Sequence, residues 1–125
     1  LTMCKILLSI NPRYVEKILS GEKKYEFRTR IAKRKVDSIL IYSTAPVKRV
    51  LAEVTVKKVL KGSPDELWDI TEKYSGIDKK FFDKYFTKRE LAYAYELGEI
   101  TRFENPKKLS EFGCINAPQS FIYIY

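Results

Sequence analysis

Three charged residues in one short stretch have the types and spacing to recognise an anion. They are Lys23, Glu26 and Arg28, within the pattern Gly21-x-Lys23-x-x-Glu26-x-Arg28. A carboxylate between two cations can orient both of them and leave their remaining hydrogen-bond donors for a phosphate or the edge of a base. The alternative is an ordinary cross-strand ion pair, which contributes roughly 0.2–1 kcal/mol. The residues alone leave both interpretations open.

The local structure around these residues decides whether they can act together. After Gly21 the side chains alternate with the period of a strand, and we expect Tyr25 and Phe27 to enter the core from one face. The opposite face carries the polar residues Lys24, Glu26, Arg28 and Arg30. A regular strand would place Lys23 on the face opposite Glu26. Convergence of the three charged side chains therefore requires the turn after Gly21 to redirect Lys23.

Patterns of hydrophobicity and capping predict the remaining elements. Strands are expected over residues 5–10, 38–43, 50–60, 90–97 and 120–125, and a loop over residues 104–113. Helices are expected between the caps Asn11 and Gly21, between Ser63 and Gly76, and over residues 78–86. In the last helix, we predict that the apolar stripe Phe81, Phe82, Tyr85 and Phe86 faces the core.

The order of these elements predicts an α+β fold that is mainly β. Strands outnumber helices, and most neighbouring strands have no helix between them. This favours a small β-barrel of about five to six mostly antiparallel strands with flanking helices. The chain has 125 residues, enough to bury one core, so residues 1–125 are expected to form a single domain.

Positive charge is concentrated in the first half of the chain. The formal net charge is +8; residues 1–61 hold 15 basic and 5 acidic residues, whereas residues 62–125 hold 9 and 11. This asymmetry favours an anionic partner, usually nucleic acid, although general solubility would also account for it. A basic segment of the chain could extend the positively charged surface that binds a phosphate backbone. The alternative is that this segment is only a solvated loop. Its residues are Arg30, Lys33, Arg34 and Lys35.

The composition excludes several kinds of chemistry. The chain has no histidine and two cysteines, which excludes Ser-His-Asp and Cys-His catalysis and leaves too few ligands for a zinc site. We expect no metal and no cofactor. Cys4 and Cys114 are predicted to be small buried hydrophobic residues rather than a disulfide. No apolar run approaches the roughly 20 residues that span a bilayer, and no secretory signal is recognised. We therefore expect a cytoplasmic protein that does not bind membranes, taken as a monomer by default.

Further polar and aromatic residues could border a binding cleft. Tyr42, Ser43 and Thr44 end a predicted strand, and Gln119 and Ser120 precede the last one. For Tyr42 the core is the favoured location. Tyrosines at alternating strand positions could stack on nucleobases, although core packing is the favoured interpretation for them too. They are Tyr93, Tyr95, Tyr123 and Tyr125.

The stretch "ILLSINPRYVEKILSGEKKYEFRTR" resembles the ASCH domain (activating signal cointegrator homology), a relative of the PUA RNA-binding domain. The family pattern G-x-K-x-x-E-x-R is matched at Gly21, Lys23, Glu26 and Arg28. The resemblance extends through "LIYSTAPVKRVLAEV", "GSPDELWDITEKYSGI", "FFDKYF" and "APQSFIYI", and so covers nearly the whole chain. It implies a PUA-like small β-barrel with flanking helices, in agreement with the fold expected from the residues.

The resemblance also implies a cleft beside the barrel that binds RNA or a nucleotide, lined by the motif residues. Some relatives are amidohydrolases of acylated cytidine that use a lysine, a threonine nucleophile three residues later and a separate glutamate. Lys23 matches that lysine, but Glu26 occupies the threonine position, and Ser75 and Gly76 stand near the expected glutamate. Ribonuclease activity, with Lys23 and Glu26 as catalytic candidates, and a protein-interaction role in transcriptional coactivation are further alternatives. The sequence therefore predicts an RNA- or nucleotide-binding module and leaves open whether it is an enzyme.

Overall fold

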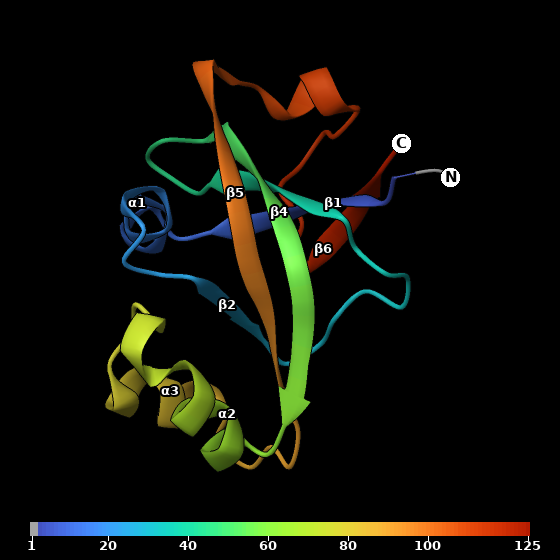
Figure 1. Ribbon diagram of the computed structural model, residues 1–125. Coiled ribbons are helices and arrows are strands. Elements are labelled where there is room, and N and C mark those ends of the chain that lie inside the picture. The colour runs from blue at the N-terminus through green and yellow to red at the C-terminus, as the bar shows by residue number, and fades with distance from the viewer. Residues whose placement is uncertain (1–2) are drawn as a thin grey trace.

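The computed structural model describes residues 3–125 and contains six strands, three α-helices and two short 3₁₀-helices (Figure 1). The strands are β1 (Lys5–Ile10), β2 (Tyr25–Arg28), β3 (Ser38–Ser43), β4 (Arg49–Gly62), β5 (Ala92–Lys107) and β6 (Phe121–Ile124). The α-helices are α1 (Pro12–Ser20), α2 (Pro64–Thr71) and α3 (Lys79–Tyr85), and the 3₁₀-helices are η1 (Glu72–Tyr74) and η2 (Leu109–Phe112). None of the helices described is long and apolar enough to cross a membrane.

All six strands belong to one sheet, in the order β2-β5-β4-β3-β1-β6. Strands β1 and β3 pair in parallel, and the other neighbouring pairs are antiparallel. The sheet contains the long strands β4 and β5, has β2 and β6 at its two edges, and curls to form a half-barrel (Figure 1). The predicted mainly β fold with mostly antiparallel strands and flanking helices is confirmed.

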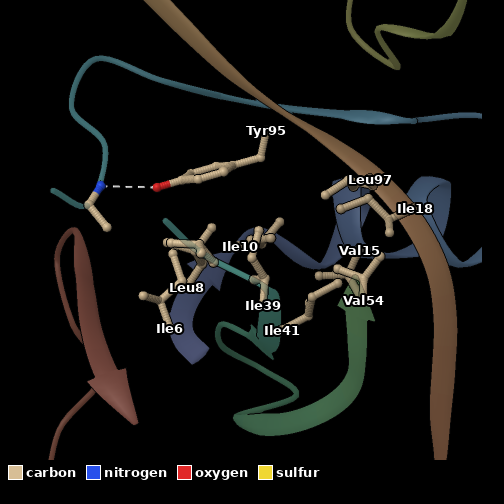
Figure 2. Close-up of a cluster of buried hydrophobic side chains, with 12 residues drawn as sticks. Ile6, Leu8, Ile10, Val15, Ile18, Ile39, Ile41, Val54, Tyr95 and Leu97 are labelled. Carbon is tan, nitrogen blue, oxygen red and sulfur yellow. Dashed lines mark hydrogen bonds between the residues drawn. The ribbon is translucent and has the colours of Figure 1, made fainter. Parts of the chain in front are cut away.

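The main hydrophobic core lies inside the curl of the sheet, between β1, β3, β5 and α1 (Figure 2). Tyr95 is 1% exposed in this core, and its hydroxyl accepts a hydrogen bond from the backbone N–H of Ala32 at 3.1 Å. Ala92 and Ala94 point to the other side of β5 and join a second cluster, which Phe27 and helices α2 and α3 form. Strand alternation therefore gives β5 a buried side chain on each face over this stretch.

The loop predicted over residues 104–113 begins later in the structure, because β5 continues to Lys107. The β4–β5 ladder contains an irregularity there, since Val50 pairs with Lys107 whereas Ala52 pairs with Arg102. Pro106 falls within this bulge, where no regular ladder hydrogen bond is required of its backbone nitrogen.

The helix predicted between Ser63 and Gly76 is also shorter than expected. Its start is correct, because the Ser63 hydroxyl accepts from the Glu66 N–H and the Glu66 carboxylate accepts from the Ser63 N–H. The α-helix ends at Thr71 and continues only as the 3₁₀ turn η1. The hydroxyl of Thr71 donates to the Leu67 carbonyl at 2.8 Å, a contact that competes with regular helix propagation.

Candidate functional site

The turn between α1 and β2 brings Lys23 to the same cleft as Glu26. Gly21 ends α1 at φ 86°, and its N–H donates to the Ile18 carbonyl. The N–H of Lys23 then donates to the carbonyl of Lys17 at 3.0 Å, which folds the chain back on the last turn of the helix before β2 begins. Glycine adopts this left-handed conformation without the strain a Cβ would cause. The bend required for convergence is therefore present.

Lys23 is buried, with 3% of its surface exposed. Its Nζ donates to the carbonyl of Ser75 at 2.7 Å and lies 4.8 Å from the ring centroid of Phe27 and 5.6 Å from that of Tyr14. Burial lowers the pKa of Lys23 to about 8, against the opposing attraction of Glu26. Lys23 is therefore a cation at neutral pH that can lose its proton in mildly alkaline solution.

Glu26 and Arg28 form a buried, hydrogen-bonded ion pair. The Oε2 atom of Glu26 accepts from Nη2 of Arg28 at 2.7 Å and from Nε at 3.0 Å. Nη2 also donates to the carbonyl of Ser9 at 3.0 Å, which joins β2 to β1 across the cleft. The pKa of Arg28 is raised: burial opposes this shift, but the charge and hydrogen bonds of Glu26 outweigh it.

One atom of each partner in this pair remains free. Within residues 3–125, Oε1 of Glu26 has no hydrogen-bond donor and Nη1 of Arg28 has no acceptor. Both side chains line the cleft. The ion pair therefore holds in place one acceptor and one donor that are not used within the pair, on two side chains that line the cleft.

Aromatic side chains form the rim of the cleft, which has a volume of about 190 Å³. Tyr14 comes from α1, and Phe81 and Tyr85 come from successive turns of α3. The rings of Phe81 and Tyr85 are nearly parallel, at an interplanar angle of 8°. The ring centroids of Phe81 and Tyr14 are 5.6 Å apart. The cleft thus combines flat apolar surfaces with the charged residues at its base.

The prediction that the whole aromatic stripe of α3 faces the core is wrong for half of its residues. Phe82 and Phe86 are buried in the second cluster, as predicted. Phe81 and Tyr85 are 43% and 38% exposed and line the cleft instead. The two pairs occupy neighbouring faces of the helix, and the i, i+4 spacing within each pair was the available signal. Tyr14 also lines the cleft, and no pattern in the sequence had identified it as a cleft residue.

The other predicted site residues lie outside the lining of the cleft. Arg30, Lys33, Arg34 and Lys35 are exposed on the connection between β2 and β3. Tyr42 is buried beside Leu40, Ser43 is buried with no partner for its hydroxyl among residues 3–125, and Thr44 is half-buried. Gln119 and Ser120 are exposed before β6, next to Pro118, whose carbonyl accepts from the Ser9 hydroxyl at 2.9 Å.

The tyrosines considered for base stacking differ in location. Tyr95 belongs to the core, as favoured by the sequence, and Tyr93 and Tyr123 are half-buried. The guanidinium of Arg34 lies 4.9 Å from the ring centroid of Tyr123 and 5.7 Å from that of Tyr125. Arg34 therefore stacks on aromatic side chains at a distance from the cleft.

The residues near the glutamate position of the amidohydrolase relatives contact Lys23. Ser75 supplies the carbonyl that Lys23 binds, and a Cβ on Gly76 would lie 2.5 Å from the Lys23 Cβ. The carboxylate in the cleft is Glu26, from the strand itself. Within residues 3–125, no three His, Cys, Asp or Glu residues are grouped to hold a metal ion. Cys4 and Cys114 are both free thiols.

The curled sheet with its helices is the fold of an ASCH domain. The family model described as "ASCH domain" matches residues 8–102, which include the three charged cleft residues. This chain belongs to the ASCH domain family, and the resemblance seen in the sequence is confirmed.

Two curated relatives and one crystal structure illustrate the relationship. The chain is 30% identical over 120 residues to "Large ribosomal subunit protein uL22" of Ureaplasma parvum, covering 95% of this chain and 39% of that protein. It is 30% identical over 92 residues to "ASCH domain-containing ribonuclease" of Zymomonas mobilis, covering 73% of this chain and 62% of that protein. The chain thus spans less than two thirds of each.

The crystal structure of ASCH from Zymomonas mobilis has a TM-score of 0.88 to this chain at 26% sequence identity. The match covers 97% of this chain and 87% of the other. The correspondence therefore includes the half-barrel and the helices that border the cleft.

Proposed function

We propose that this chain binds RNA, and that the cleft around Glu26 is its recognition site. The observation that carries the proposal is the convergence of Lys23, Glu26 and Arg28 at the base of one concave cleft rimmed by aromatic rings. Aromatic faces stack on bases with little regard to sequence, and buried cations bind phosphate. The relative named a ribonuclease supports RNA over other anions.

The free atoms of the ion pair suggest how a nucleotide is held. Nη1 of Arg28 can donate to a phosphate or a base acceptor, and Oε1 of Glu26 can accept from a base N–H or a ribose hydroxyl. A simple phosphate site would contain only donors. The carboxylate therefore supports recognition of a nucleoside together with its phosphate, rather than phosphate alone.

The Glu26→Gln variant tests this proposal. We expect it to bind a single-stranded RNA of about 12 nucleotides about tenfold more weakly than the wild type, because one charge-assisted hydrogen bond to the ligand is lost. Glutamine retains an oxygen that accepts from Arg28, so the cleft should keep its shape. Fluorescence anisotropy at low and moderate salt measures the effect.

The control is Glu104→Gln, which removes the same charge from an exposed position on β5. Non-specific phosphate binding follows net positive charge, so this control should bind RNA equally well or slightly more tightly. If Glu26→Gln behaves like Glu104→Gln, the cleft does not recognise RNA and only the general positive charge attracts it.

A second candidate function is cleavage of the bound RNA at the same cleft. It is favoured by the lowered pKa of Lys23, which lies near the pH at which a general acid works well. In this reaction the ribose 2′-hydroxyl loses its proton to Glu26 and attacks the adjacent phosphorus. The bond from phosphorus to the 5′ oxygen breaks, and that oxygen takes the proton of Lys23. Arg28 stabilises the charge on the phosphorane, and a 2′,3′-cyclic phosphate is formed.

For this second candidate, Lys23→Met is expected to lower the cleavage rate by at least about 100-fold, because it removes the proton donor. The matched control is Lys24→Met, since Lys24 is the exposed neighbour and should be dispensable. Gel analysis of the cleaved RNA and mass determination of its 3′ ends measure the rate and the product. If the wild-type protein binds RNA but releases no fragments, the cleavage proposal is wrong and only the binding proposal stands.

A further inference from the structure

A second and larger cavity lies at the opposite end of β1 from the cleft. Its volume is about 910 Å³. We call it the distal groove and define it by the lining residues Lys5, Arg34, Phe103, Lys107, Phe112 and Tyr123. The cleft meets β1 at Ser9 and Ile10, whereas the distal groove meets it at Lys5. At about 3.3 Å per residue, the two cavities are separated by roughly 15 Å along the strand.

The distal groove combines cations with aromatic faces. The Arg34 guanidinium lies 4.9 Å from the ring centroid of Tyr123, and Nζ of Lys107 lies 5.2 Å from that of Phe103. Neither Arg34 nor Lys107 forms an ion pair within residues 3–125. Both positive charges are therefore available to an anion, and each is held against a flat ring.

The carboxylate in the distal groove is already neutralised. Glu53 forms an ion pair with Lys5 at 3.0 Å and accepts a hydrogen bond from the Ser38 hydroxyl at 2.7 Å. It is the only acidic residue among the described residues that line the groove. The groove therefore presents a net positive surface, although one acid lies within it.

A basic segment connects the two cavities. The chain leaves the cleft at Arg28, at the end of β2, and reaches the distal groove at Arg34. Arg30 and Lys33 are exposed between them, and residues 29–36 contain no acid. The next acid, Asp37, accepts from the Cys4 N–H at 2.7 Å. A polyanion that leaves the cleft along this segment would meet four exposed cations and no acid, the cations being Arg30, Lys33, Arg34 and Lys35.

We propose that the distal groove is a second binding site for single-stranded RNA, occupied by the part of a strand that extends beyond the cleft. This inference rests on the proposed binding of RNA in the cleft. Unpaired cations bind the phosphates. A base can stack on the guanidinium plane of Arg34 or on the ring of Tyr125, which also lines the groove and is 95% exposed. This is the combination that single-stranded nucleic acid requires. An acidic peptide would satisfy the cations but would not use the aromatic faces.

The double variant Arg34→Gln/Lys107→Gln tests the inference with RNAs of about 4 and about 12 nucleotides. We expect affinity for the longer RNA to fall about tenfold and affinity for the shorter RNA to change less than about twofold, because only the longer strand reaches the groove. The slope of log affinity against log salt should fall by about 1.4 for the longer RNA, since two phosphate contacts of a single strand are lost.

The control is Lys61→Gln/Lys88→Gln, which removes the same net charge from exposed lysines that line neither cavity. Equal losses in the test and control variants would overturn the inference, as would equal losses for the two RNA lengths. Glu26→Gln distinguishes a failure of this inference from a failure of the proposed function, because it should weaken the binding of both the shorter and the longer RNA. If Glu26→Gln weakens neither while the groove variant weakens the longer RNA, the groove binds RNA and the cleft assignment fails.

Discussion

Replacing Gly76 by alanine is expected to lower the free energy of unfolding by about 3 kcal/mol. A Cβ on residue 76 would lie 2.5 Å from Cβ, 2.6 Å from Cγ and 2.8 Å from Cδ of Lys23. These atoms belong to the buried stem of the lysine, which cannot move aside as the end of an exposed side chain would. Gly76 also has φ +69°, which alanine adopts with strain. Urea denaturation followed by circular dichroism measures the loss.

Gly21→Ala is the matched control for this prediction. Gly21 has φ +86°, but nothing lies within 4 Å of the Cβ that alanine would add. This variant should therefore lose only the conformational part, about 1 kcal/mol. Equal losses in the two variants would contradict the prediction, because they would show that the clash of the added Cβ with Lys23 does not lower stability. RNA binding should fall further in Gly76→Ala than in Gly21→Ala, because only the former displaces Lys23.

The contribution of Lys23 to the free energy of unfolding is expected to rise by roughly 2 kcal/mol between about pH 7.5 and about pH 9.5. The pKa of Lys23 is lowered from 10.5 to about 8 by burial. Below pH 8 the lysine is protonated in both the folded and the unfolded chain, and the folded state bears the full cost of burying the charge. Between pH 8 and pH 10.5 the unfolded chain binds the additional proton, so the free energy of unfolding increases with pH.

Chemical denaturation of the wild type and Lys23→Met across this range measures the effect. Methionine keeps most of the apolar stem and has no proton to lose, so the rise due to Lys23 should be absent. Burial raises the pKa of the Cys114 thiol, which lowers the stability of both proteins toward pH 9.5, so the difference between the two profiles measures the contribution of Lys23. Lys24→Met should retain the wild-type slope, because Lys24 is exposed. Burial raises the pKa of Tyr85 and Tyr95 above the usual 10, which affects stability only at higher pH. Wild-type and Lys23→Met profiles that change equally with pH would contradict the assignment of a lowered pKa to Lys23.

The burial of a protonated lysine lowers the stability of the fold at neutral pH. The carbonyl of Ser75 and the nearby rings compensate only in part, as the lowered pKa shows. A residue retained at such a cost supports a role in binding or catalysis rather than in folding. The Glu26–Arg28 pair differs from Lys23, because each charge compensates the other. Removal of one partner would leave an uncompensated buried charge and should cost about 3–5 kcal/mol.

Local signals in the sequence specified the elements around the cleft. Asn11 caps α1 by accepting from the Arg13 N–H, and Gly21 ends the helix with a left-handed residue. The alternation in β2 correctly placed Phe27 in the core, where it belongs to the second cluster. These features depend on residues a few positions apart, and their physics is complete within a short segment. The motif residues of the cleft could therefore be named before the fold was known.

The rim of the cleft could not be predicted in the same way. Tyr14 and Tyr85 are far apart in the sequence, and the position of α3 against β2 brings them to one opening. The aromatic residues of α3 have nearly the same hydrophobicity, so composition could not separate Phe81 and Tyr85 from Phe82 and Phe86. Their environments differ because the core covers one face of the helix and leaves the adjacent face open.

The sequence by itself determined the family, the mainly β fold and the identity of the three charged residues. The tertiary structure decided that these residues converge in one cleft and are shielded from water, rather than forming an exposed surface ion pair. Desolvation by distant segments makes that difference: Ser75 and Gly76 enclose Lys23, and β1 supplies the Ser9 carbonyl that holds Arg28. Burial lowers the pKa of a lysine and strengthens a charged hydrogen bond only when the whole fold excludes water, which no short stretch of sequence can do.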